Sequence, residues 1–251
     1  MVNRTRSFLL SSLLLLWSAS AGFAQEISPK DTEDWSRKPP LVAPGKRGTA
    51  PSDAIILFSG KRDLDKWEHP DGTQVKWKVK GDVLTIEKDA TDLRTKQPFG
   101  SVQLHIEWKT PDPKEDGSNS RGNSGVFLMD QYELQIYESY QDMSVIYYNG
   151  QAASIYKQHI PLVNASTAPQ TWQTFDVVFN APEFNPDKSL KTPAYITVFH
   201  NGVLVQNHVE IKGPMMYEGY PEYTYHAAKL PIRLQEHDSR VSFRNIWVRE
   251  L

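Results

Sequence analysis

Hydrophobic and polar residues alternate with a period of two along most of the chain beyond residue 53, the pattern of β-strands that bury one face. No window of helical length keeps hydrophobic residues at positions i, i+3, i+4 and i+7. The alternating segments are 75–79, 83–86, 102–109, 132–137, 175–179, 196–198, 232–237 and 241–248. About ten short strands in roughly 200 residues predict one all-β domain, a sandwich or jelly roll.

The part of the chain that precedes this alternation divides into two segments. Residues 1–24 have the features of a signal peptide, with a basic start, a hydrophobic run at 8–17 and small residues before the expected cleavage after Ala24. The run is shorter than the roughly 20 residues that a membrane-spanning helix needs, and an uncleaved anchor is the alternative. Residues 25–53 contain five prolines among polar residues, which predicts a flexible tether. The single folded domain is therefore expected over 54–251.

Composition and charge exclude several classes of partner and site. The chain has 28 Lys and Arg against 30 Asp and Glu, a net charge of -2, so bulk charge does not point to nucleic acid or an anionic membrane. Cysteine is absent, which excludes disulfides, thiolate metal sites and a cysteine nucleophile. An exported chain without cysteine is typical of the bacterial envelope. We expect a periplasmic or secreted protein that does not insert into the membrane once its signal is removed.

The alternation also assigns polar side chains to the outer faces of the sandwich. When the hydrophobic residues of 102–109, 132–137 and 232–237 face the core, their polar neighbours face outward. A concave outer face would collect such residues in a groove, whereas the alternative is a set of scattered solvent-facing residues. The residues expected to line one polar cleft are Glu107, Glu133, Gln135, Gln235 and His237.

Two long irregular stretches, 111–122 and 215–229, interrupt the strands. The second carries four tyrosines, whose ring faces stack on sugar C–H groups, so it is either a sugar platform or a flap packed on the sandwich edge. Other chemistries leave no signal: the chain has no G-x-S-x-G elbow, no glycine-rich phosphate loop and no H-E-x-x-H motif. No cofactor is predicted, and a divalent metal is neither indicated nor excluded.

The segment from Glu133 to Glu138 reads E-x-Q-x-x-E and is similar to the E-x-D-x-x-E strand of jelly-roll glucanases, in which two carboxylates flank the glycosidic bond. Gln135 stands here in place of the aspartate. Regular alternation places Glu138 on the opposite face from Glu133 unless a bulge intervenes. The motif is therefore weak support for the ordinary acid and nucleophile roles.

Four stretches carry a more specific resemblance. Residues 57–64 (LFSGKRDL) with Trp67, 121–128 (RGNSGVFL), 132–136 (YELQI) and 231–246 (PIRLQEHDSRVSFRNI) follow one another in the order of a known bacterial family. The combination resembles the 3-keto-disaccharide hydrolase domain, formerly a domain of unknown function. The resemblance implies a concanavalin-like fold, a two-sheet antiparallel jelly-roll sandwich of the lectin and glucanase type.

The same resemblance implies a hydrolase or lyase that acts on glycosides whose sugar carries a 3-ketone. A carbonyl at C3 acidifies the C2 proton, so a base can remove it, the C1 substituent leaves with a proton from an acid, and water then adds to the glycal. This route needs one base, one acid and donors for an enolate oxygen. It does not need two carboxylates at a fixed separation. The expected partner is an oligosaccharide or glycoside.

On this view the catalytic candidates are His237, Glu133 and Glu107. His237 carries proton transfer with Glu133, because imidazole has an ordinary pKa near 6.5 and offers both protonation states. Arg121 supplies positive charge for a developing enolate. The substrate-binding candidates are Arg121, Asn123, Gln135, Gln235, His105 and Tyr156. A non-catalytic carbohydrate-binding module and an ordinary jelly-roll glucanase are the alternative functions.

Overall fold

The computed structural model describes residues 27–46, 48–116, 120–141 and 146–251 and divides into two units, 1–41 and 42–251. The predicted signal peptide lies outside the described residues. In the first unit the described chain forms one short 3₁₀ helix, η1 (Pro29–Thr32), which Ser28 caps. No helix in the described ranges is long and apolar enough to span a bilayer.

The second unit contains the strands, separated by short helical turns. The strands are β1 (Ile55–Phe58), β2 (Trp67–Glu68), β3 (Lys78–Lys80), β4 (Val83–Thr85), β5 (Leu93–Thr95), β6 (Val102–Lys109), β7 (Ser124–Leu128), β8 (Tyr132–Ile136), β9 (Gln173–Asn180), β10 (Glu183–Phe184), β11 (Leu190–Thr192), β12 (Tyr195–His200), β13 (Val203–Glu210), β14 (Arg233–Leu234) and β15 (Ser242–Glu250). The helical turns are η2 (Lys61–Lys66), α1 (Pro113–Asp116) and η3 (Tyr148–Gly150).

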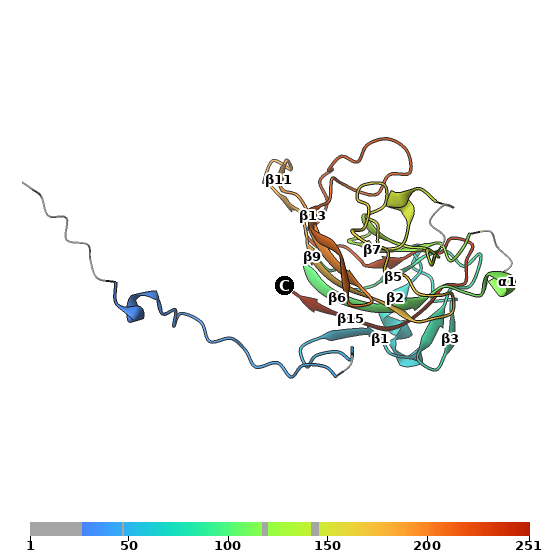
Figure 1. Cartoon of the computed structure of the whole chain (residues 1–251), viewed down its shortest axis with the longest axis horizontal. Helices are drawn as coiled ribbons and strands as arrows, with labels where there is room; N and C mark the ends of the chain where they lie inside the picture. Colours follow the sequence, from blue (N-terminus) through green and yellow to red (C-terminus); the bar gives the residue numbers. More distant parts are fainter. Residues whose placement is uncertain (1–26, 47, 117–119, 142–145) are drawn as a thin grey trace, which may run out of the picture. The chain divides into compact units, whose positions relative to one another are not determined.

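Two antiparallel sheets form the sandwich (Figure 1). The larger has eight strands in the order β13-β12-β9-β6-β15-β4-β3, and β1 pairs with β15. The smaller has five strands in the order β2-β5-β14-β7-β8, and β10 and β11 form a separate hairpin. The expected all-β jelly-roll sandwich is confirmed.

The core lies between the two sheets and is built from the hydrophobic half of the alternation. Leu104, Ile106 and Trp108 of β6 and Leu134 and Ile136 of β8 are at most 1% exposed and belong to one continuous cluster. Burial of such side chains stabilises the fold by about 25 cal/mol per Å². The polar residues between them therefore lie on the outer face of the sheet to which their strand belongs.

The outer face of the larger sheet is partly covered by the end of the proline-rich stretch. The Gly48 carbonyl accepts hydrogen bonds from Asn245 Nδ2 (2.9 Å) and Trp247 Nε1 (3.3 Å). Arg249 also pairs with Asp53, with Nη2 2.6 Å from Oδ2. These bonds attach residues around 48–53 to β15, while the domain boundary at residue 53 stays a prediction.

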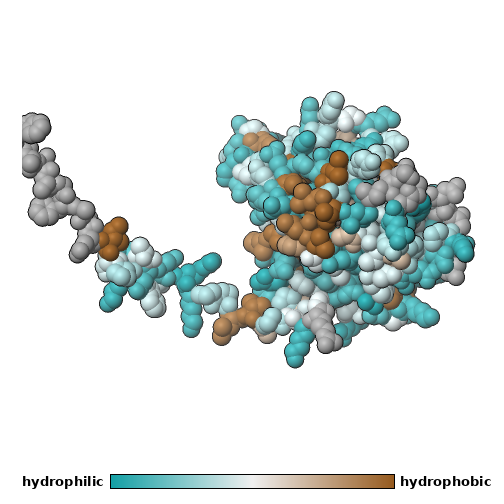
Figure 2. All heavy atoms as spheres, in the orientation of Figure 1, coloured by the Kyte–Doolittle hydropathy of each residue, from teal (hydrophilic) through white to brown (hydrophobic). Residues whose placement is uncertain are grey.

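Hydrophobic side chains gather on the face of this unit that is turned toward the viewer in Figure 2.

The edge strand β13 is partly covered by the segment 160–163, where Leu162 N donates to the Val205 carbonyl at 2.8 Å. Because that backbone contact occupies part of the edge, fewer groups of β13 are left to pair with another strand.

Candidate active site

A cavity of about 220 Å³ opens on the outer face of the five-stranded sheet. We call it the carboxyl cavity, after the one acidic side chain among its described lining residues. It is lined by Asn123, Glu133, Gln135, Tyr156, Met215, Tyr217, Gln235 and His237. Six of the nine side chains predicted from the sequence therefore meet here, from β8, from the approach to β7, from the segment after η3 and from the segment after β14.

Glu133 forms the buried acidic part of this cavity. It is 5% exposed, and no described residue donates a hydrogen bond to its carboxyl group. Burial raises the pKa of Glu133 to about 8, the Arg233 charge acts in the opposite direction, and the Asp92 carboxylate adds to the increase. Such a pKa near neutrality is typical of a group that transfers protons.

Gly125 makes the space that the Glu133 carboxyl occupies. It pairs with Gln135 across β7 and β8, and a Cβ at this position would lie 2.5 Å from Glu133 Oε1. The same Cβ would lie 2.9 Å from the ring of Phe127. The glycine of the N-S-G segment is therefore required by close approach.

Arg233 and its partners modulate the charge near Glu133, and the sequence did not single them out as site residues. The Arg233 guanidinium lies 3.6 Å from the centre of the Phe127 ring and pairs with the carboxylates of Asp92 and Asp130. The Arg233 charge lowers the pKa of Glu133, but burial, the largest effect, and the Asp92 carboxylate outweigh it. The sequence could have indicated Arg233 only through strand alternation, because Arg233 lies two residues before Gln235 and therefore on the same outward face.

A chain of amides orients His237. Gln135 Nε2 donates to Asn123 Oδ1 (3.2 Å), and Asn123 Nδ2 donates to His237 Nδ1 (3.3 Å). An Nδ1 that accepts a hydrogen bond leaves the proton of the neutral ring on Nε2. The exposed His237 thus presents an N–H donor.

Tyr156 adds a second hydroxyl-bearing wall. Its hydroxyl lies 2.5 Å from that of Tyr147, and its backbone N donates to the Glu133 carbonyl (3.3 Å). Burial, together with the Tyr147 hydrogen bond, raises the pKa of Tyr156. The hydroxyl therefore stays protonated near neutral pH and can donate a hydrogen bond.

The tyrosine-rich loop supplies the last two lining residues, Met215 and Tyr217, which the sequence left unassigned. Met215 N donates to the Gln131 carbonyl at 2.8 Å, and Lys157 Nζ donates to the Tyr217 carbonyl at 2.5 Å. Gln158 holds the start of the loop, because Lys212 N donates to its Oε1 at 2.7 Å. This part of the loop is a wall of the cavity, and of the two interpretations left open, the structure favours a role at the site.

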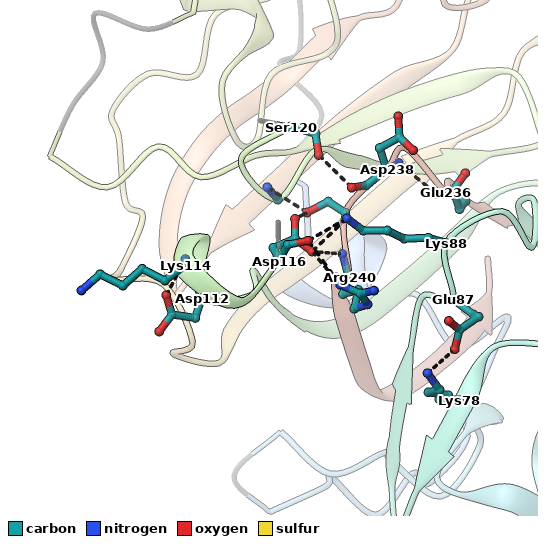
Figure 3. A network of polar contacts seen from close by, with 12 residues as sticks. Lys78, Glu87, Lys88, Asp112, Lys114, Asp116, Ser120, Glu236, Asp238 and Arg240 are labelled. Carbon is teal, nitrogen blue, oxygen red and sulfur yellow. Dashed lines mark hydrogen bonds and ion pairs between the residues drawn. The ribbon is translucent and has the colours of Figure 1, made fainter. Parts of the chain in front are cut away.

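The turn that follows His237 is held by the buried Asp116 of α1 (Figure 3). Asp116 Oδ2 accepts from Ser239 Oγ (2.8 Å), and Asp116 Oδ1 accepts from Arg240 N (3.0 Å). Ser239 Oγ in turn accepts from Gly122 N (3.1 Å), one residue before Asn123. The network joins the two segments that carry His237 and Asn123.

Arg121 does not line the carboxyl cavity. Its Nη2 donates to the Glu138 carbonyl (3.5 Å), and its backbone carbonyl accepts from Glu138 N (2.8 Å). The buried Nε has no hydrogen-bond partner within the described ranges. Arg121 has a positive φ of 51° and turns the chain just before Asn123.

The expectation that Glu107 shares the cleft with Glu133 is wrong, and His105, a predicted substrate-binding residue, lies beside Glu107 and away from that cleft. Both lie on β6, on the outer face of the eight-stranded sheet, with the core between them and the carboxyl cavity. His105 Nδ1 is 2.6 Å from Asp176 Oδ1, while Glu107 accepts from Arg244 Nε (2.6 Å) and Asn245 Nδ2 (2.8 Å). Burial tends to raise the pKa of Glu107, but these hydrogen bonds outweigh it and lower the pKa.

Glu138 does not provide a second carboxylate in the cavity. It is buried beyond the end of β8, where it accepts from Thr110 Oγ1 (3.0 Å) and Tyr140 N (2.8 Å). Within the described part of the chain, no group of three or more His, Asp or Glu is arranged to hold a metal ion. The carboxyl cavity thus brings together one carboxyl group, one imidazole, and amide and hydroxyl groups that can donate hydrogen bonds.

Comparison with known proteins identifies the family. A crystal structure from Parabacteroides distasonis, provisionally named a glycosyl hydrolase, is 43% identical, with a TM-score of 0.82, and the match covers 94% of this chain and 100% of that one. A second such structure from the same organism is 20% identical with a TM-score of 0.58, covers 79% and 94%, and shows the fold alone. No curated protein sequence matches. The model of the 3-keto-alpha-glucoside-1,2-lyase-like domain matches residues 53–249, and the chain belongs to this family of carbohydrate-active, hydrolase-like proteins.

Proposed function

We propose that the protein is an exported bacterial enzyme that cleaves 3-keto-glycosides by elimination across C1 and C2, followed by addition of water. The observation that carries the proposal is Glu133, a buried carboxyl group with a pKa of about 8 in a cavity otherwise lined by polar and tyrosine side chains and Met215. The family description, which names a 1,2-lyase acting on 3-keto-alpha-glucosides, supports the same reaction class.

Glu133 is the base in this proposal. The C3 carbonyl acidifies the C2 proton, and the Glu133 carboxylate accepts it while the electron pair of the C–H bond moves into the enolate. A carboxylate whose acid has a pKa of about 8 is a stronger base than an ordinary glutamate. The enolate oxygen is stabilised by donors in the cavity, among them the side-chain amides of Gln135 and Gln235.

His237 is the acid. When the enolate collapses, a C1=C2 double bond forms, the bond from C1 to the glycosidic oxygen breaks, and the departing oxygen takes a proton from His237. The product is a 1,2-unsaturated 3-keto sugar, and addition of water across its double bond completes the net hydrolysis. The acid is the imidazolium form of His237, which gives up its Nε2 proton, and rotation of the Asn123 amide would then present an oxygen to the Nδ1–H. The proposal assigns no step to a metal ion.

An ordinary glycosidase mechanism is less well supported by this geometry. Retaining and inverting enzymes use two carboxyl groups about 5–10 Å apart across the scissile bond. Among the cavity's described lining residues, Glu133 is the one carboxylate, and Glu138 is engaged elsewhere. Elimination needs a single base and fits this set.

The test is incubation of the purified protein with a 3-keto-glucoside and with its unoxidised parent in D₂O. We expect cleavage of the keto substrate alone, an enone absorbance, and deuterium at C2 of recovered substrate or product. Glu133→Gln keeps the size of the side chain and removes the base, so the rates of cleavage, of enone formation and of deuterium incorporation should all fall at least about a hundredfold. Cleavage of the parent alone, or keto-substrate cleavage without deuterium at C2, would contradict the proposal.

Export is part of the same proposal and rests on the leader pattern of residues 1–24. Expression of the full chain in a bacterium should yield a mature protein that starts at Gln25 and is found in the periplasm or medium. N-terminal sequencing checks this, and a cytoplasmic protein with an intact leader would contradict it.

A further inference from the structure

A second cavity, of about 430 Å³, adjoins the carboxyl cavity. We call it the tyrosine cavity. It is lined by Tyr147, Asn149, Tyr156, Lys157, Gln158, Met216, Tyr217, Gly219, Tyr220 and Pro221. Tyr156 and Tyr217 line both cavities, and the neighbouring Met215 and Met216 each face one of them. The two spaces therefore share a wall.

The volumes of the two cavities indicate how a substrate would be distributed between them. Sites for small molecules usually enclose about 300–1,000 Å³, and the carboxyl cavity, at about 220 Å³, has room for one compact ring. The rest of a larger glycoside must extend past its rim. The tyrosine cavity is the adjoining space that can receive it.

The chemistry of the tyrosine cavity is suited to binding and not to proton transfer. It contains four tyrosines and no carboxylate among its described lining residues. Tyrosine rings stack on the flat faces of sugars and aromatic groups, while their hydroxyls form hydrogen bonds. Lys157 Nζ lies over one face of the Tyr147 ring (5.5 Å) and of the Tyr217 ring (4.2 Å), whereas Tyr220 is 92% exposed and offers the most accessible ring face to a ligand.

We propose that the tyrosine cavity binds the leaving group of the glycoside and selects leaving groups that contain a flat six-membered ring, either a second pyranose or an aromatic alcohol. The inference rests on the proposed function, because it takes the carboxyl cavity as the site of the keto sugar. The shared wall then lies at the glycosidic oxygen. Tyr156 contacts both halves of the substrate and orients them across that bond.

Lys157 sets the charge of this subsite. Its Nζ lies 4.2 Å from the centre of the Tyr217 ring, and its backbone N donates to the Asn149 carbonyl at 2.8 Å. A cation held at the wall, without a lining carboxylate, disfavours a positively charged leaving group. Neutral and anionic rings are accepted.

The kinetic test compares 3-keto-glucosides that carry a methyl, a phenyl or a glucosyl leaving group. Tyr220→Ala removes a ring that lines only the tyrosine cavity, and Tyr220→Phe keeps that ring. We expect Tyr220→Ala to lower the ratio of kcat/KM for ring over methyl substrates by about three- to tenfold, and Tyr220→Phe to preserve the ratio. Tyr225→Ala is the matched control, because Tyr225 is an exposed tyrosine of the same loop that lines neither cavity.

A binding measurement keeps this inference separate from the proposed reaction. The wild type is titrated with unoxidised phenyl, glucosyl and methyl glucosides. The phenyl and glucosyl compounds, whose leaving groups contain a ring, should bind more tightly than the methyl compound. Tyr220→Ala should remove this difference in affinity. A gain for phenyl alone identifies an aromatic alcohol as the preferred ligand, and a gain for glucosyl alone identifies a sugar. Equal binding of all three, or equal effects of Tyr220→Ala and Tyr225→Ala, would overturn the subsite even if 3-keto-glycosides are cleaved. A ring preference without cleavage would overturn only the reaction.

Discussion

At the scale of single residues, the environment of Glu133 determines its chemistry. A glutamate in water is a weak base, but this one lies beneath the cavity surface next to the glycine that makes room for it. Asp92 and Asp130 engage Arg233, the nearby cation that would otherwise favour the carboxylate. Glu133 therefore holds its proton to a higher pH than an ordinary glutamate.

The raised pKa of Glu133 links stability to pH. The folded state keeps the proton up to a pKa of about 8, whereas the unfolded state releases it near pH 4.5, so folding stability falls as pH rises between these values. Glu133→Gln cannot ionise and should escape this loss. We expect the Tm of Glu133→Gln minus the Tm of the wild type to increase from pH 5 to pH 8 and then level off. A constant difference across the range would contradict the pKa.

The same titration governs activity. If Glu133 is the base, kcat/KM for a nitrophenyl substrate, whose leaving group departs without a proton from His237, should rise with pH and level off above about pH 8, because the free enzyme must lose the Glu133 proton. A rate profile from pH 5 to pH 10 measures it. A rate that falls through pH 8 would assign Glu133 the role of the acid instead.

His237 offers the complementary residue test. It is exposed, so His237→Ala should fold normally, and loss of the general acid should cost about a hundredfold or more in kcat. A substrate with a more acidic leaving group, such as a nitrophenol, should recover most of that loss. Near-wild-type cleavage of a poor leaving group by His237→Ala would end the assignment.

Gly125→Ala tests the close approach directly. The new Cβ would meet both Glu133 Oε1 and the Phe127 ring, and the resulting shift should destabilise the fold by about 1–3 kcal/mol. Cleavage should fall at least tenfold because the carboxyl is displaced. Denaturant unfolding and initial rates measure the two effects, and an active variant of unchanged stability would contradict the packing.

At the scale of elements, the cavity is built where segments distant in the sequence are joined by hydrogen bonds. The short helix α1 contributes Asp116, which holds the turn after His237, and Ser239 connects this turn to the approach to β7 (Figure 3). On the other side, Gln158 and Lys157 hold the tyrosine-rich loop against the sheet. The walls of the site are loops that specific side chains order.

Asp116→Asn should weaken the first of these connections. Ser239 Oγ and Arg240 N donate to different oxygens of the carboxylate, and in asparagine one of these oxygens becomes an NH2 group, so one of the two bonds is lost and we expect a loss of about 1–3 kcal/mol in stability. Because the turn positions His237, kcat should fall while KM changes little. Substrates with good leaving groups should suffer less, which a general loss of stability would not produce. An equal loss for all substrates would make Asp116 a structural residue alone.

At the scale of the whole molecule, the two sheets separate two polar surfaces. The outer face of the smaller sheet carries the carboxyl cavity, and that of the larger sheet carries Glu107, His105 and the bonds to Gly48. The core lies between them, so the second surface has no access to a substrate in the cavity.

Glu107→Gln is the prediction at this scale. The ion pair with Arg244 and the lowered pKa of Glu107 stabilise the fold above the ordinary pKa of a glutamate, and this stability is lost as pH falls through the lower pKa. We expect a Tm that is lower than wild type at pH 7 and converges with it in acid. Cleavage rates should stay within about twofold, and a hundredfold loss would restore Glu107 to the catalytic set.

The sequence by itself determined the sandwich, because a period of two separates buried from outward residues wherever a strand forms. It also indicated that Glu133, Gln135, Gln235 and His237 face outward. It could not assign them to a surface, because a sandwich has two outer faces and alternation is identical on both. Only the strand order, with β7 between β8 and β14, brought these residues together and placed Glu107 and His105 on the far side. The loop walls likewise depend on contacts between residues such as Lys157 and Tyr217, which no local pattern records.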